Sequence, residues 1–128
     1  MWEFLVAGSV LGFVAVLTGT FGAHALKPKL HASGQQPTFD TAVRYQLAHA
    51  LAVILLAVLA GVGPVASSPT SLLRWSGWLF VAGTTLFSGP LYLLALGGSR
   101  RWGAVAPLGG SGLLAGWAVL VAYALSAR

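Results

Sequence analysis

Four long apolar stretches, each almost free of charged residues, constrain the fold of this chain more than any other feature of its sequence. A helix needs roughly 20 predominantly apolar residues to cross the hydrocarbon core of a bilayer. Such stretches lie at about residues 4–26, 42–64, 74–98 and 102–126. Because short connections make successive helices antiparallel neighbours, the sequence predicts an all-α membrane protein. We expect an antiparallel bundle of four transmembrane helices that forms a single domain over residues 1–128.

The composition argues against a water-soluble protein. Only 7% of the 128 residues are charged and 57% are hydrophobic, whereas about a quarter of a soluble domain is charged. The net charge of +5 comes from basic residues at the ends of the apolar stretches. A nucleic-acid-binding protein needs a clustered basic face, so we expect no nucleic-acid partner. The absence of cysteine excludes disulfides and thiolate metal sites.

The basic residues also predict how the chain is oriented in the membrane. Loops one and three would share one side, and loop two and both termini the other. The first side carries Lys27, Lys29, Arg44, Arg100 and Arg101, and the second carries Arg74 and Arg128. Cytoplasmic loops are enriched in lysine and arginine. We therefore expect a multi-pass protein of the inner (plasma) membrane, with loops one and three in the cytoplasm and both termini outside.

Glycines at regular spacing predict close helix packing. The first stretch contains Gly8, Gly12 and Gly19, and the fourth contains Gly112 and Gly116. Small residues at such spacing let two helix backbones approach closely in lipid. The sequence leaves open whether these faces meet within one chain or between two copies, so a homo-oligomer is one alternative.

Polar residues gather near the end of the predicted bundle that carries loops one and three. Polar groups inside a membrane are costly and are a functional hypothesis by default. A small polar pocket or pathway open to the cytoplasm is one interpretation; hydrogen bonds that simply hold the helices together, worth on average about 0.6 kcal/mol each, are the other. The candidate pocket-lining residues are His24, Arg44, Tyr45, Gln46, His49, Ser88 and Tyr92.

Three local features refine these expectations. Asp40 and Arg44 are four residues apart and could form an ion pair on one helix face. Pro90 removes one backbone hydrogen bond from the third stretch, and a break in the fourth is expected around residues 107–110. His24 and His49 could ligate a haem iron, but no further ligands accompany them, so no metal or cofactor is predicted.

No catalytic motif is present. The sequence contains no nucleophile elbow, no phosphate-binding loop and no zinc-protease motif. Its acidic residues, Glu3 and Asp40, fall on opposite sides of the predicted membrane, so they cannot act as a catalytic pair. We therefore do not expect an enzyme.

Four sequence blocks resemble the DUF423 family of small bacterial membrane proteins, which includes the homologues of human transmembrane protein 256. The blocks are residues 19–26, residues 44–51 with Phe39, residues 86–92, and residues 107–110 with Gly116 and Trp117. Pro90 stands where the family commonly has serine, and Ala106 where threonine usually precedes the proline. The resemblance implies a four-helix membrane protein, and it implies that the seven candidate pocket residues match family motif positions. It supplies no function.

The leading hypothesis from the sequence is a binding or pathway protein whose intramembrane pocket faces the cytoplasm. Arg44 would attract a small anionic ligand or a lipid headgroup, and membrane lipids are the expected partners. The alternative is a structural or accessory scaffold that self-associates through its glycine faces or docks on a larger complex. A haem-binding protein is the third hypothesis.

Overall fold

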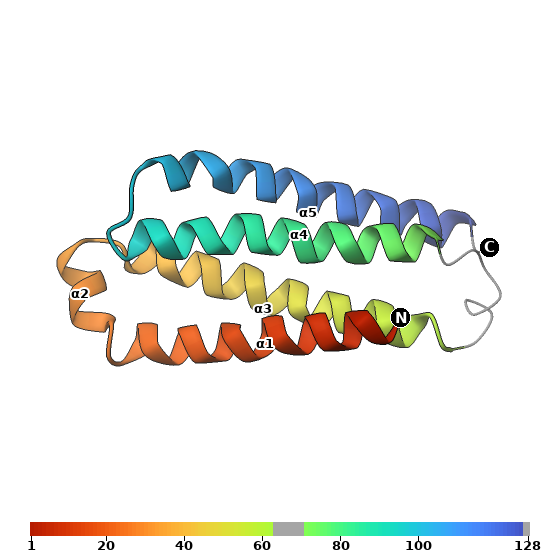
Figure 1. Cartoon of the computed structure of the whole chain (residues 1–128), viewed down its shortest axis with the longest axis horizontal. Helices are drawn as coiled ribbons and strands as arrows, with labels where there is room; N and C mark the ends of the chain where they lie inside the picture. Colours follow the sequence, from red (N-terminus) through yellow and green to blue (C-terminus); the bar gives the residue numbers. More distant parts are fainter. Residues whose placement is uncertain (63–70, 127–128) are drawn as a thin grey trace.

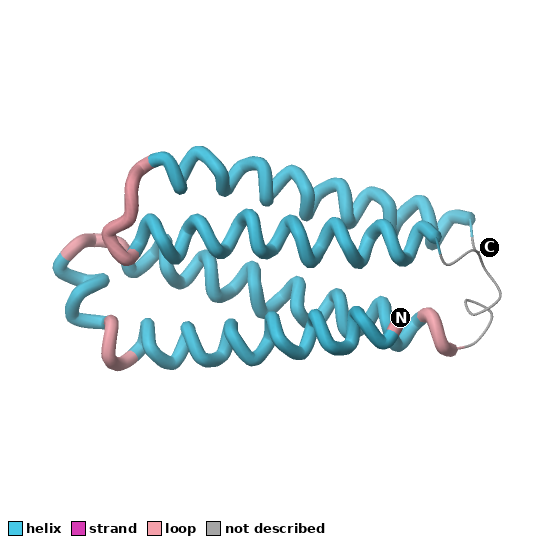
Figure 2. Tube along the Cα trace, in the orientation of Figure 1, coloured by secondary structure: helices cyan, strands magenta, loops and turns pink. Residues whose placement is uncertain are grey.

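Figure 1 shows the computed structural model of the chain, which describes residues 1–62 and 71–126. Helices account for nearly all of these residues, and the described part of the chain contains no strand (Figure 2). The elements in order are α1 (Trp2–Ala23), α2 (Lys27–Ala32), α3 (Gln36–Leu59), α4 (Ser71–Ala95) and α5 (Arg101–Ser126).

The four long helices run antiparallel to one another, as the sequence predicts. Figure 1 shows α2 and the α4–α5 turn at one end of the bundle, which we call the α2 end, and the N-terminus and the end of α5 at the other. The helices pack mainly in the order α1–α3–α4–α5. The central pair is therefore α3 and α4, with α1 flanking α3 and α5 flanking α4. This offset arrangement leaves two seams, between α1 and α4 and between α3 and α5, that are not closed by backbone packing.

The first connection contains a short helix that the sequence analysis missed. We expected the first apolar stretch to continue to about residue 26 and to stop before Pro28, but α1 ends at Ala23 and α2 begins at Lys27. Proline is well tolerated in the first turn of a helix, so Pro28 starts α2 instead of ending α1. Leu30 anchors α2 because it is fully buried in a small cluster with Phe39 and Ala95.

Proline and glycine also set the bounds of the other helices. Pro37 lies in the first turn of α3, which begins at Gln36, several residues before the predicted span. Helix α5 runs through Pro107 without interruption, so the break expected at residues 107–110 is wrong. Glycine ends two helices with a left-handed backbone, Gly34 after α2 at φ 67° and Gly97 after α4 at φ 98°.

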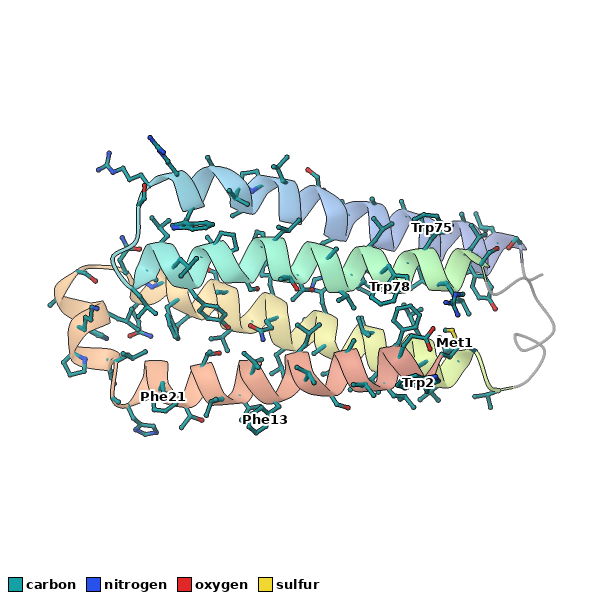
Figure 3. All side chains as sticks on the ribbon, viewed as in Figure 1. Met1, Trp2, Phe13, Phe21, Trp75 and Trp78 are labelled. Carbon is teal, nitrogen blue, oxygen red and sulfur yellow. The ribbon has the colours of Figure 1, made fainter. Side chains whose placement is uncertain are left out.

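The outer surface of the bundle is apolar. All four long helices are long and apolar enough to cross a membrane. Figure 3 shows Phe13 and Phe21 pointing away from the bundle, and Phe13 is 69% exposed. Trp2 and Trp75 lie near the N-terminal end, where aromatic side chains typically sit at a membrane interface. An apolar surface of this extent belongs in lipid, so the chain is a multi-pass membrane protein.

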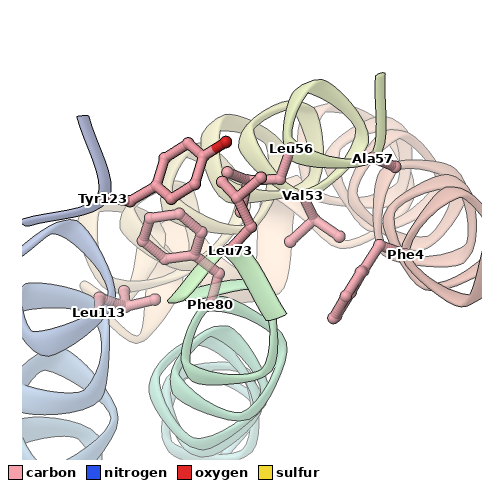
Figure 4. Close-up of a cluster of buried hydrophobic side chains, with 8 residues drawn as sticks. All are labelled: Phe4, Val53, Leu56, Ala57, Leu73, Phe80, Leu113 and Tyr123. Carbon is pink, nitrogen blue, oxygen red and sulfur yellow. The ribbon is translucent and has the colours of Figure 1, made fainter. Parts of the chain in front are cut away.

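The main hydrophobic core lies toward the N-terminal end of the bundle, where side chains from all four long helices meet (Figure 4). Its largest fully buried rings are Phe4 of α1 and Phe80 of α4. The full set is Phe4, Val53, Leu56, Ala57, Leu73, Phe80, Leu113 and Tyr123.

The glycines singled out in the sequence lie at helix contacts within this chain. A Cβ at Gly8 would lie 2.9 Å from the carbonyl oxygen of Ala50, and Gly12 and Gly19 also face α3. In α5, a Cβ at Gly112 would lie 3.3 Å from the Cα of Gly83, and one at Gly116 would lie 2.7 Å from the Phe80 ring. These faces are therefore occupied by intrachain partners and are not free for self-association.

Candidate functional site

Polar side chains join each pair of packed long helices. Gln46 of α3 donates to the carbonyl of Leu11 on α1 at 2.9 Å, and Ser88 of α4 donates to the carbonyl of Ala42 on α3 at 2.8 Å. On the other side of α4, Ser76 donates to the carbonyl of Gly116 on α5 at 2.9 Å. All three donor side chains are buried. These bonds fit the structural interpretation that the sequence left open.

Two further bonds cross the seams between helices that pack little against each other. The hydroxyls of Thr18 on α1 and Tyr92 on α4 are 3.0 Å apart. Trp117 of α5 donates its indole N–H to Nε2 of His49 on α3 at 3.2 Å. Each seam is thus bridged by a hydrogen-bonded side-chain pair and is open beside it.

The wider opening lies between α3 and α5, with Phe87 of α4 between them. We call it the aromatic groove. It has a volume of about 440 Å³. A neighbouring hollow of about 360 Å³ shares Phe87 and is lined by Pro37, Thr38 and Thr41 at the start of α3. The lining residues of the aromatic groove are Tyr45, His49, Phe87, Pro107, Gly110, Ser111, Leu113, Leu114 and Trp117.

The narrower opening lies between α1 and α4, beside Gln46 of α3. We call it the hydroxyl groove, because hydroxyl side chains of α4 form much of its wall. Its volume is about 210 Å³. The lining residues are Val10, Leu11, Val14, Gln46, Thr84, Thr85, Ser88, Gly89 and Tyr92.

The structure does not gather the candidate pocket residues into one pocket, which corrects the sequence interpretation. Tyr45 and His49 line the aromatic groove, whereas Gln46, Ser88 and Tyr92 line the hydroxyl groove. The reason is helix geometry, since neighbouring residues in α3 point about 100° apart around its axis. Tyr45 and Gln46 therefore face different grooves although they are adjacent in sequence.

His24 and Arg44 line neither groove. His24 follows the last residue of α1 and is exposed. Arg44 is exposed about 12 Å along α3 from Gln36, close enough to the helix end for its long side chain to reach the interface. The expected pair with Asp40 does not form. Asp40 accepts a 2.8 Å hydrogen bond from Gln36 instead, and Arg44 has no ion pair within residues 1–62 and 71–126.

His49 has the most defined environment of the candidate residues. It is 8% exposed, and its Nδ1 lies 2.8 Å from the carbonyl oxygen of Tyr45. Because the Trp117 indole can only donate, Nε2 must accept, and the proton of the neutral ring must sit on Nδ1. Both ring nitrogens are therefore engaged, which leaves neither free to ligate a haem iron.

Aromatic rings surround His49 and form the base and sides of the groove. The centroids of Tyr45 and Phe87 are 4.6 Å apart, those of Phe80 and Trp117 are 5.0 Å apart, and the His49 ring lies 5.4 Å from Phe80. Tyr45 and Trp117 are nearly half exposed, so their rings also present a face toward lipid. The groove can therefore stack flat groups and has no charged side chain in its lining.

Sequence reasoning missed several residues of these sites. Trp117 was noted only within a family block, and nothing in the spacing indicates that it reaches from α5 to His49. Nothing in the sequence singles out Thr18, Ser76 and Thr84, because hydroxyl residues in membrane helices often bond only to their own backbone. Thr18 also makes such a bond, to the carbonyl of Val14 at 2.9 Å.

Comparison with known proteins gives a consistent result along almost the whole chain. The model of the family described as "Protein of unknown function (DUF423)" matches residues 18–110. A UPF0382 membrane protein of Staphylococcus haemolyticus is 39% identical over 119 residues, which cover 92% of this chain and 91% of the relative. The UPF0382 inner membrane protein YgdD of Escherichia coli K12 is 37% identical over 121 residues, 94% of this chain and 88% of the relative.

No solved structure matches this chain. The relatives are named as membrane proteins, and the Escherichia coli relative as an inner membrane protein, in agreement with the apolar helices described above. By the match to the family model and by these relatives, the chain belongs to the DUF423 family.

Proposed function

We propose that this chain is an integral membrane protein that binds a small molecule. Its aromatic groove takes up an uncharged, flat, amphipathic molecule from the bilayer. The observation that carries the proposal is the aromatic-walled groove of about 440 Å³ around the buried, hydrogen-bonded His49. This volume lies within the usual range for small-molecule sites, which are mostly apolar with a few placed polar groups.

The chemistry of the groove narrows the class of ligand. Tyr45 and Trp117 offer ring faces for stacking. The Ser111 hydroxyl already donates to the carbonyl of Pro107 at 3.0 Å, so it can only accept a further bond. The ring faces and the hydrogen-bond acceptor together match a ligand with a flat ring and a polar group that donates a hydrogen bond.

The absence of charge in the groove lining changes the role we assign to Arg44. An anionic group would have no counter-charge among the lining residues. Arg44 instead fits a contact with lipid phosphate at the membrane surface. The proposed ligand enters sideways from the bilayer, and the hollow that shares Phe87 leads from the groove toward the α2 end.

A groove-filling variant tests the proposal. Leu114→Trp adds bulk to the groove without removing a side-chain hydrogen bond, and Val121→Trp makes the matched change on α5 outside both grooves. Native mass spectrometry from mild detergent should find an adduct of defined mass on wild type and on the Val121 variant but not on the Leu114 variant. A bare chain in all three samples, or an adduct equally retained in all three, would contradict the proposal.

The charge distribution supports a cytoplasmic α2 end. Five basic residues, Lys27, Lys29, Arg44, Arg100 and Arg101, lie in or near the α2 end and are exposed. At the opposite end the described residues carry Arg74, which forms a 3.0 Å ion pair with Glu3. Arg128 lies outside the described residues. By the positive-inside rule, the α2 end faces the cytoplasm and the N-terminus faces outside.

Single cysteines can test this orientation because the chain has none of its own. We expect Ser71→Cys to react with a membrane-impermeant maleimide on intact cells, and Ser33→Cys to react only after permeabilisation. The reverse pattern would overturn the proposed orientation and leave the groove unaffected.

A further inference from the structure

The hydroxyl groove contains more hydrogen-bonding capacity than the protein uses. Five of its nine lining residues, Gln46, Thr84, Thr85, Ser88 and Tyr92, have polar side chains. In a bilayer no solvent water satisfies such groups, and each unsatisfied one is costly. The unused capacity of these side chains therefore indicates what the groove holds.

Thr84 is the clearest case. Its side chain is fully buried, and its Oγ1 has no hydrogen-bond partner within the described chain. Thr85, the next residue, shows the contrast, because its hydroxyl donates to the carbonyl of Val81 on its own helix at 2.8 Å. A buried hydroxyl without a partner typically costs about 1–3 kcal/mol. Thr84 lines the groove, so a molecule held there could supply the missing bond.

Two other lining residues, Gln46 and Tyr92, add further hydrogen-bonding capacity along the groove. The amide of Gln46 uses its Nε2 to reach Leu11, and its Oε1 accepts no hydrogen bond from residues 1–62 and 71–126. The Thr18 hydroxyl donates to the carbonyl of Val14 at 2.9 Å, so the Tyr92 hydroxyl must supply the proton of their 3.0 Å bond. Tyr92 then keeps lone pairs free to accept.

The groove is closed at both ends and carries no charge. Toward the α2 end the Thr18–Tyr92 pair bridges α1 and α4. Toward the N-terminal end the rings of Phe4 and Trp78 bridge the same helices, with centroids 5.2 Å apart. No lining residue is basic or acidic. An occupant must therefore be small and neutral, and must both donate and accept hydrogen bonds.

We propose that the hydroxyl groove is a second binding site, which holds a neutral hydroxyl group beside Thr84 and Gln46 in the interior of the membrane, with Tyr92 lining the groove about 12 Å further along α4. The volume of about 210 Å³ far exceeds what one water molecule needs. Bound water and the hydroxyl of a short membrane-dissolved alcohol share this chemistry. Helical threonine populates two side-chain rotamers, and the one that turns Oγ1 toward the groove completes the site.

Radical footprinting in lipid nanodiscs tests whether water is the molecule that occupies the groove. Water held at the site produces hydroxyl radicals beside Leu11, Val14 and Tyr92 when the sample is irradiated, whereas residues that face only lipid chains stay unlabelled. We expect oxidation of these three residues in wild type, a several-fold decrease in Thr84→Val, and recovery in Thr84→Ser. Thr20→Val is the matched control and should label like wild type, because Thr20 lines neither groove and its hydroxyl donates to the carbonyl of Val16 on its own helix at 2.8 Å.

The photoreactive alcohol 3-azioctanol tests the other source in the same nanodiscs. If an alcohol occupies the groove, the probe labels α1 and α4 at the groove, excess octanol competes with it, and Thr84→Val weakens the labelling several-fold. Either water oxidation or alcohol labelling that depends on Thr84 supports the site. Absence of both, or equal labelling in wild type and Thr84→Val, would overturn the proposal and would not affect the aromatic groove.

Discussion

Two grooves run along this bundle, one between α3 and α5 and the other between α1 and α4. A hydrogen-bonded side-chain pair bridges each of them, His49 with Trp117 in the aromatic groove and Thr18 with Tyr92 in the hydroxyl groove. The aromatic groove is twice as large, about 440 Å³ against about 210 Å³, and four of its nine lining residues have aromatic rings. The hydroxyl groove has aliphatic residues on α1 and hydroxyl residues on α4.

The difference shows how an offset four-helix bundle can carry two sites with different chemistry. Helices α3 and α4 pack closely in the centre, and each outer helix covers only part of that pair. The groove at α5 satisfies its buried polar side chain, His49, because both ring nitrogens are engaged. The groove at α1 does not, since Thr84 has no partner within the described residues. We therefore expect stacking and shape to decide binding in the aromatic groove, and hydrogen bonding in the hydroxyl groove.

The largest loss of stability should come from a change that separates α4 from α5 and removes the aromatic groove altogether. A Cβ at Gly109 would collide with the backbone of Leu86 and Phe87, whereas one at Gly110 would only touch the Phe87 ring at 3.6 Å. We expect Gly109→Ala to destabilise the protein by about 3 kcal/mol or more and Gly110→Ala to change little. Thermal unfolding monitored by size exclusion in detergent measures both. Equal melting temperatures for the two variants would contradict the helix contact.

A smaller loss of stability should follow when the His49–Trp117 bridge across the aromatic groove is removed. His49→Leu removes the acceptor for Trp117, and hydrogen bonds between membrane helices are worth on average about 0.6 kcal/mol. We expect a modest loss of stability but complete loss of the ligand adduct, because the Trp117 ring is no longer held at the groove. Melting curves and native mass spectra measure the two effects. Strong destabilisation would indicate that His49 is mainly structural.

The smallest loss of stability should follow when the Thr18–Tyr92 bridge across the hydroxyl groove is removed. Tyr92→Phe and Thr18→Val each remove one hydroxyl of the 3.0 Å pair. A double-mutant cycle of melting measurements should give a coupling energy of about 0.6 kcal/mol. The aromatic groove should keep its adduct in all three variants. Loss of the adduct would mean that the two grooves are not independent.

The fold was predictable from the sequence because each helix is encoded by its own composition. Four apolar stretches bounded by charged, proline or glycine residues suffice for the bundle and its antiparallel order. The short α2 was not predicted because Pro28 can either end a helix or begin one. The burial of Leu30 against Phe39 and Ala95 decides that Pro28 begins a helix. This contact joins distant parts of the chain.

The candidate site was predictable only in its residue types. Depth along a helix places Tyr45, Gln46 and His49 near the same end, but the side of the bundle each one faces depends on how α3 is rotated against its neighbours. That rotation follows from contacts such as Gly8 against Ala50. The pairing of Trp117 with His49 likewise depends on the register of α5 against α3, which spacing within one helix does not contain.

Site-specific photocrosslinking in native membranes tests the central claim most directly. A benzophenone amino acid at Ser111 stands at the aromatic groove, and the same residue at Val121 stands on α5 outside both grooves. We predict an adduct of one defined mass at Ser111 that is absent at Val121. If both positions capture only bulk phospholipid in equal yield, the aromatic groove is not a binding site and the account of its function is wrong.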